Sequence, residues 1–298
     1  MTFISQTSGS GYPPGASRAS VPLRMTPARW VVLALALPVA LALIGWTGFS
    51  LVGLVAEGSY PFSYAVPVQN GQVNVTLNGG NVTLRQISGS TAQVTGTVQY
   101  GLFRPGISES ATPGGVYVGV NCDAINSNCN ANATLDVPAG TAATVSSDGG
   151  DIGVSGFSSG MTLSTQGGNL TASNLGGNLK LDTGGGDLST NGITGNLQFS
   201  TDGGNVNADA VTSQQVTIAS GGGDVTLAFS QVPHNLRITA QGGNVTVILP
   251  PGDTKYNIST PDTQGGNVNF PSTLASSTSP DNISVDSGGG DITITQAS

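Results

Sequence analysis

Nine asparagine or aspartate residues share one setting in this sequence, because each follows two glycines and precedes an aliphatic residue. We call them the turn column: Asn81, Asp151, Asn169, Asp187, Asn205, Asp224, Asn244, Asn267 and Asp291. Side-chain oxygens repeated in this way could bind a hard cation such as calcium, or could accept hydrogen bonds from the backbone of the adjoining turns. The residues around the column distinguish these two chemistries.

Calcium prefers several carboxylates among its oxygen ligands. The sequence offers carboxylate pairs at Asp148/Asp151, Asp182/Asp187 and Asp286/Asp291. Five of the nine column residues are neutral asparagines, however, and calcium-binding β-rolls space their glycines, aspartates and aliphatic residues differently. Because an amide can cap a turn without a cation, the sequence predicts a structural turn column with no metal and no other cofactor.

The numbers and positions of the charged residues and of histidine also disfavour catalysis. Glycan hydrolysis needs two carboxyl groups facing each other across about 5–10 Å. The chain has 14 aspartates but only eight lysines and arginines, and no cluster combines the two. The single histidine, His234, follows Pro233 at an expected turn, where we expect an exposed and inert imidazole. We therefore expect no catalytic residues, and a polysaccharide-active β-helix enzyme is the least favoured reading.

Two alternating apolar pairs lie between successive column residues, as in Leu170/Ala172 and Leu179/Leu181. Alternation with period two is typical of short, half-buried strands. The glycine pairs are expected to provide positive φ or tight turns between them. From Asp151 on, the column recurs every 18 to 24 residues, which indicates a stacked repeat. We predict an all-β, β-solenoid or β-helix-like stack with rungs of about 18–20 residues; an antiparallel β-prism or sandwich is the alternative.

Charge and hydropathy divide the chain into segments. Residues 1–29 carry only the charges of Arg18, Arg24 and Arg29 and show no apolar periodicity, so we expect a disordered cytoplasmic tail. Residues 30–56 contain no formal charge and are long enough for one transmembrane helix. Because the arginines precede this span, the positive-inside rule places the remainder of the chain outside the cell.

Two other interpretations of the apolar segment remain. One is a buried helix of a soluble protein, although 27 uncharged residues exceed an ordinary core helix. The other is a signal peptide cleaved near Ala40-Leu41-Ala42, which would leave an apolar new N-terminus. Beyond the span we expect a stalk at 57–68 and a β-repeat ectodomain at 69–298, interrupted by an irregular insert at 101–140.

The only two cysteines, Cys122 and Cys129, lie in that insert. An exported pair seven residues apart predicts a local disulfide. From Glu57 onward there are five basic and sixteen acidic residues, a net charge of −11 that repels nucleic-acid phosphate. The expected partners are therefore the membrane and a glycan or protein ligand outside the cell, and not nucleic acid.

The steps from Gly149-Gly150-Asp151-Ile152 to Gly289-Gly290-Asp291-Ile292 resemble those of the bacterial putative-adhesin domain family, glycine-rich β-repeat domains of the cell surface. The resemblance covers about residues 69–298. It implies a β-repeat domain behind one membrane span and no catalytic residues to transfer. The insert with the two cysteines departs from the simple repeat.

Together these observations predict a single-pass, non-catalytic protein of the cell membrane, with a cytoplasmic N-terminus and an extracellular β-repeat domain. Its expected role is that of an adhesin or surface-binding module. The alternative is an envelope-stress sensor or regulatory accessory protein, in which the span would engage a partner.

Overall fold

The computed structural model describes residues 36–39, 43, 58–101, 103–112, 115–121, 129–261 and 263–298. The chain divides into two compact units, residues 1–51 and 52–298. In the first unit, residues 36–39 are helical. Within the described ranges, no helix has the length and apolar character needed to cross a membrane. The predicted tail and most of the predicted span at 30–56 lie outside those ranges.

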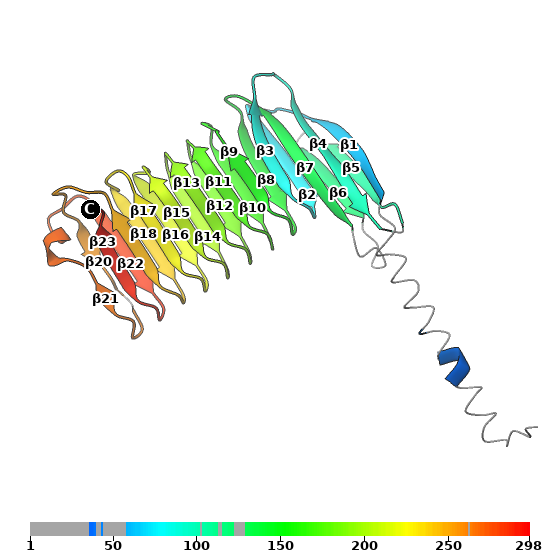
Figure 1. The fold of residues 1–298 in the computed structure, drawn as a ribbon. Helices are drawn as coiled ribbons and strands as arrows, with labels where there is room; N and C mark the ends of the chain where they lie inside the picture. The colour runs from blue at the N-terminus through cyan, green and yellow to red at the C-terminus, as the bar shows by residue number, and fades with distance from the viewer. Residues whose placement is uncertain are drawn as a thin grey trace, which may run out of the picture. The chain divides into compact units, whose positions relative to one another are not determined.

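The described residues of the second unit form 23 strands in two sheets and one short 3₁₀ helix at Ser272–Leu274 (Figure 1). Sheet A has the spatial order β1 (Gly58–Val66), β4 (Ala92–Tyr100), β7 (Asn130–Pro138), β3 (Val82–Ile87), β9 (Ile152–Ser155), β11 (Leu170–Leu175), β13 (Leu188–Ile193), β15 (Val206–Val211), β17 (Val225–Phe229), β19 (Val245–Leu249), β23 (Ile292–Gln296) and β21 (Val268–Asn269). Sheet B has the order β20 (Asn257–Ser259), β22 (Asn282–Ser287), β18 (Asn235–Ala240), β16 (Gln215–Ser220), β14 (Leu197–Thr201), β12 (Leu179–Thr183), β10 (Met161–Thr165), β8 (Ala142–Ser147), β2 (Gln72–Asn78), β6 (Gly115–Asn121) and β5 (Gly106–Thr112).

Each rung of the repeat contributes one strand to each sheet. The chain runs along sheet B, turns at the glycine pair, returns along sheet A and then enters sheet B again one position further on. Successive rungs pair in parallel, with register partners such as Met161 and Leu179, or Leu197 and Val216, which are 18 and 19 residues apart. The parallel pairing confirms the predicted solenoid, and the antiparallel prism or sandwich is wrong for the repeat.

The core is a double row of aliphatic side chains between the sheets. The predicted inward pairs are buried, as for Leu170/Ala172 and Leu179/Leu181, all at most 3% exposed. Ile258 is only partly buried, because its strand β20 is the last one in sheet B and has no further rung beyond it. The buried apolar residues of the described part run from Phe62 to Ile294, so the second unit carries its own hydrophobic core.

The last rung in the sequence is not the last rung in space. Strand β22 pairs with β18 on one side and with β20 on the other, and β23 likewise lies between β19 and β21. The C-terminal rung is therefore inserted between the two rungs that precede it in the sequence. The rung left at the end has strands of only three and two residues, which shortens the exposed sheet edge.

The other end of the stack corrects two expectations. The predicted stalk at 57–68 instead contributes β1, which pairs antiparallel with β4 over nine residues. Its Pro61 is tolerated because β1 is an edge strand. The predicted irregular insert at 101–140 contains β5, β6 and β7, of which β5 pairs antiparallel with β6 and β7 joins β4 to β3. Antiparallel strands thus close the N-terminal end of a parallel stack.

Candidate functional site

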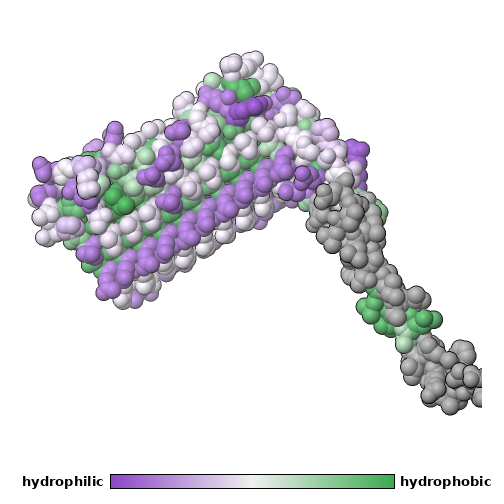
Figure 2. Space-filling model, in the orientation of Figure 1, coloured by the Kyte–Doolittle hydropathy of each residue, from purple (hydrophilic) through white to green (hydrophobic). Residues whose placement is uncertain are grey.

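The turn column lies at the turns that carry the chain from sheet B to sheet A. The Oδ1 of every member except the terminal Asn267 accepts the backbone N–H of the member in the next rung. For Asp151, for example, Oδ1 accepts from Asn169 at 2.8 Å, while its own N–H is donated to Asn81 at 3.0 Å. The eight bonds of this kind are 2.7–3.0 Å long and run without interruption from Asn81 to Asn267. Figure 2 shows a continuous hydrophilic row along one long edge of the stack, as a column with one residue per rung requires.

The spatial order of the column differs from its order in the sequence. Because the C-terminal rung is inserted, Asp291 lies between Asn244 and Asn267. The order along the stack is therefore Asn81, Asp151, Asn169, Asp187, Asn205, Asp224, Asn244, Asp291, Asn267. Asparagine and aspartate alternate strictly, so no two carboxylates are neighbours. Two asparagine amides, those of Asn205 and Asn267, also donate to the adjacent aspartate at 3.3 and 3.0 Å.

A second column, of buried hydroxyls, lies three residues before the second glycine of most turns. Those of Ser147, Thr165, Thr183 and Thr201 accept the N–H of that glycine at 3.0–3.4 Å. They also donate to the corresponding glycine carbonyl of the preceding rung at 2.7–3.5 Å. Sequence reasoning missed this column, although a serine or threonine at that fixed offset is its visible signal.

Two turns lack the hydroxyl and show its effect on the backbone. Leu77 and Ala240 occupy the hydroxyl position there, and the second glycines, Gly80 and Gly243, adopt φ of +97° and +80°. Where the hydroxyl is present, as at Thr183 and Thr201, the second glycine does not have a positive φ. The hydroxyl therefore holds the turn in a conformation open to any residue. Of the two expected roles of the glycine pairs, positive φ at the second glycine is confined to Gly80 and Gly243, and the other pairs form turns without it at that position.

Close packing between rungs is what requires the second glycine. A Cβ on Gly204 would lie 1.9 Å from the carbonyl oxygen of Gly186, and a Cβ on Gly186 would lie 2.0 Å from that of Gly168. The first glycine is different, since a Cβ on Gly203 would meet nothing within 4 Å. Only one glycine of each pair is thus fixed by the approach of two backbones.

The remaining predicted residues fall into three groups. Cys129 is disulfide-bonded, whereas Cys122 lies outside the described residues, so their pairing stays a prediction. His234 lies at the expected turn with its side chain 55% exposed, but it is not inert, because its Nδ1 hydrogen-bonds Oδ1 of the largely buried Asp281. In the described part of the chain, no group of three or more His, Cys, Asp or Glu side chains comes together to hold a metal ion.

Among the described residues, Tyr256 is the largest fully buried side chain, and it lies on the terminal rung. Burial raises the pKa of its phenol, and the negative charge of Asp281 raises it further. The hydroxyl has no hydrogen-bond partner among the described residues. It therefore contributes bulk to the end of the core rather than chemistry.

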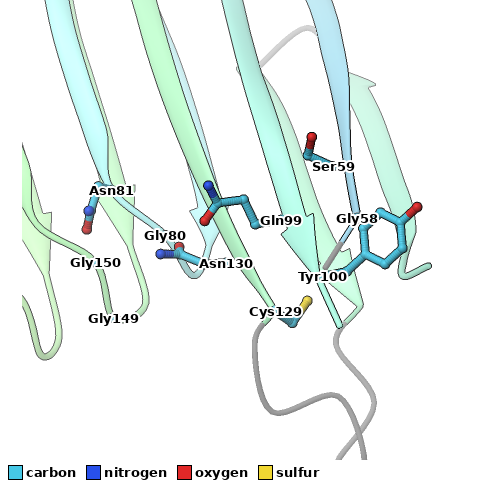
Figure 3. Close-up of a pocket in the computed structure, with 10 residues that line it drawn as sticks. All are labelled: Gly58, Ser59, Gly80, Asn81, Gln99, Tyr100, Cys129, Asn130, Gly149 and Gly150. Atoms are coloured by element: carbon cyan, nitrogen blue, oxygen red, sulfur yellow. The ribbon is translucent and has the colours of Figure 1, made fainter. Parts of the chain in front are cut away.

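A groove of about 820 Å³ lies where the antiparallel strands meet the repeat (Figure 3). Its ten lining residues are Gly58, Ser59, Gly80, Asn81, Gln99, Tyr100, Cys129, Asn130, Gly149 and Gly150, and none is charged. Ser59, Gln99 and Asn130 are cross-strand neighbours on β1, β4 and β7. This volume lies within the range of about 300–1,000 Å³ that is typical of small-ligand sites.

Three comparisons place the chain among known proteins. The family model described as Toastrack DUF4097 matches residues 106–295. No curated protein sequence matches the chain. The chain is similar to a crystal structure of a putative cell adhesion protein from Clostridium sporogenes, with 14% identity, coverage of 80% of this chain and 100% of that chain, and a TM-score of 0.27. It is also similar to a putative adhesin from Parabacteroides merdae, with 10% identity, coverage of 82% and 97%, and a TM-score of 0.36.

The family match spans more than half of the chain and includes eight of the nine turn-column residues, from Asp151 to Asp291. It confirms the resemblance to glycine-rich β-repeat domains that the Gly-Gly-Asn/Asp steps indicated. The chain belongs to the Toastrack DUF4097 family.

Proposed function

We propose that this protein is a single-pass, membrane-anchored and non-catalytic surface module. In this proposal residues 1–29 are cytoplasmic, residues 30–56 span the membrane and the β stack is displayed outside the cell, where it binds a surface ligand. The family membership supports an adhesin-like domain, and the anchor rests on the uncharged segment and the arginines before it.

The observation that carries the proposal is the unbroken hydrogen-bond ladder of the turn column. The side chains best suited to bind a metal or to act as acids and bases direct their oxygens to the next rung instead. The repeat's most distinctive residues are therefore used to build a rigid stack. Such a stack is suited to holding a binding surface at a fixed distance from the membrane.

The outward faces supply a surface for contact. On sheet B, Thr162, Lys180, Gln198 and Thr217 form one row across four adjacent strands. On sheet A, Thr171, Ser189, Asn207 and Thr226 form another. Uncharged hydrogen-bonding groups predominate in both rows, which suits glycan or protein ligands better than a polyanion.

A deletion strain tests the proposal against the sensor alternative. Loss of attachment or aggregation, restored by the full-length gene, supports the surface module. Normal attachment together with altered envelope-stress transcription would favour the regulatory alternative instead. Protease added to intact cells tests the orientation, because it should digest residues 57–298 and spare the tail, whereas protection of the ectodomain until lysis would contradict it.

A further inference from the structure

We propose that the groove lined by Ser59, Gln99, Asn130 and Asn81 binds a neutral oligosaccharide. This inference rests on the proposed surface function and assigns it a site and a ligand class.

The wall offers donors and acceptors without charge. The side chains of Ser59, Gln99 and Asn130 are exposed and make no hydrogen bond to the described residues, in contrast to Gln93, which donates to Ser63 at 2.6 Å. Asn81 uses its Oδ1 for the column, while its amide nitrogen has no described partner. Amides and hydroxyls that can both donate and accept match sugar hydroxyls, which do the same.

The spacing of these groups suits a chain of sugar rings. Ser59, Gln99 and Asn130 are in register on three adjacent strands of sheet A. Neighbouring strands lie about 4.8 Å apart, which is close to the length of one pyranose unit. A linear oligosaccharide crossing the strands would therefore meet a new polar side chain at each ring.

The floor of the groove is kept bare by the packing of the rungs. A Cβ on Gly80 would lie 1.6 Å from the carbonyl oxygen of Ala131, and a Cβ on Gly150 would lie 1.8 Å from that of Gly80. Side chains are thus excluded from the floor for the same reason that they are excluded from the turns. The ring of Tyr100 forms the far end, fixed over Gly58 and 5.9 Å from the ring of Tyr60. Figure 3 shows this arrangement, with Tyr100 beside Gly58 and Asn81 at the opposite end.

Charge selects against acidic ligands. None of the ten lining residues is a lysine, arginine or histidine, and the chain from Glu57 onward carries a net charge of −11. An acidic polysaccharide would therefore meet repulsion and would find no cationic side chain in the groove lining. A neutral oligosaccharide would not meet this repulsion.

The test is calorimetric titration of the full-length protein in lipid nanodiscs, which avoids sugar-based detergents. Cellotetraose and chitotetraose are the neutral probes, and trigalacturonic acid is the acidic one. At least one neutral probe should bind, and the acidic probe should bind at least about tenfold more weakly. The double variant Gln99→Ala/Asn130→Ala should weaken neutral binding by about tenfold or more at an unchanged melting temperature.

The matched control is Gln215→Ala/Asn235→Ala, an exposed Gln/Asn pair in register at the start of β16 and β18 in sheet B, which should bind as the wild type does. If the groove variant melts early, Ser59→Trp serves instead, because it fills the groove from an exposed edge position and should abolish binding. The proposal would be overturned if neither neutral probe bound at millimolar concentration, or if the protein preferred the acidic probe. It would also be overturned if the control variant lost as much affinity for the neutral probes as the groove variant.

Cell attachment that persists without probe binding would refute this site alone, whereas probe binding without any attachment role would refute the proposed function.

Discussion

Asp291 donates its backbone N–H to Oδ1 of Asn244 at 3.0 Å, although 47 residues separate them in the sequence. This bond joins the inserted C-terminal rung to the rest of the turn column. It also completes the strict alternation of amide and carboxylate along the stack. At the opposite end of strands β18 and β22, the hydrogen bond between His234 and Asp281 holds the start of the same rung, since Asn282 follows Asp281 and donates its N–H to the carbonyl of His234 at 2.8 Å.

The alternation predicts that adding a charge to the column is worse than removing one. Asn205→Asp would place three carboxylates in a row, about 4.8 Å apart, and should lower the free energy of unfolding by about 1 kcal/mol, less in high salt. Asp187→Asn keeps the Oδ1 acceptor and should change stability by less than about 0.5 kcal/mol. Urea unfolding at low and high salt measures both, and a large loss in Asp187→Asn would show that the column needs its carboxylates.

The two glycines of one turn should respond differently to the same substitution. Gly204→Ala puts a methyl group where the carbonyl of Gly186 lies, so it should cost about 3 kcal/mol or prevent folding. Gly203→Ala has space and no positive φ, so it should be neutral or slightly stabilising. Thermal melting compares the pair, and equal effects would contradict the close approach of the rungs.

Two buried threonines of one rung form a second matched pair. Thr183→Val removes the hydroxyl that bonds Gly168 and Gly186, and should cost about 2 kcal/mol. Thr190 has no described partner for its buried hydroxyl, so Thr190→Val should raise the free energy of unfolding by about 1 kcal/mol. Denaturant midpoints show whether each variant is more or less stable than the wild type. Destabilisation by Thr190→Val would contradict the prediction, because it would mean that this hydroxyl has a hydrogen-bond partner.

Alkaline pH should act on the terminal rung through Tyr256. Its pKa is raised in the folded state, so the unfolded chain loses this proton first, near pH 10. The associated stability is therefore present below about pH 10 and is lost as the pH rises towards the folded value. Tyr256→Phe should flatten this loss without a penalty at pH 7, whereas Tyr117→Phe, at an exposed position, should not alter the profile. Melting temperatures measured from pH 8 to 11 test this prediction. If the melting temperature of Tyr256→Phe fell with pH as steeply as that of the wild type, Tyr256 would not be the group responsible.

Much of the repeat could be predicted because its signals are local. The inward pairs, the glycine steps and the period follow directly from side-chain alternation and turn chemistry. The spatial order of the last two rungs could not be predicted in this way. The pairs Tyr256/Ile258 and Ile283/Val285 show the same inward pattern, so either could lie next to Leu236/Ile238 in the stack. Long-range pairing decides between them, and the short strands of the terminal rung favour its place at the edge.

The N-terminal strands were missed for other reasons. In β1, Pro61 favoured a stalk over a strand, although the alternation of Tyr60, Phe62 and Tyr64 was a strand signal. In β7, small alanines at 131 and 133 weakened the apolar pattern before Leu135. The groove combines residues from β1, β4, β7 and two turns, so no local spacing could have indicated it.

The central claim is that the stack holds itself together through the turn column and needs no metal. A fragment of residues 57–298, which contains the whole described core, tests it by circular dichroism during thermal unfolding. The account predicts a β-type spectrum in excess chelator and a melting temperature that moves little when millimolar calcium is added. A fragment that is unfolded in chelator and gains β structure with calcium would contradict it.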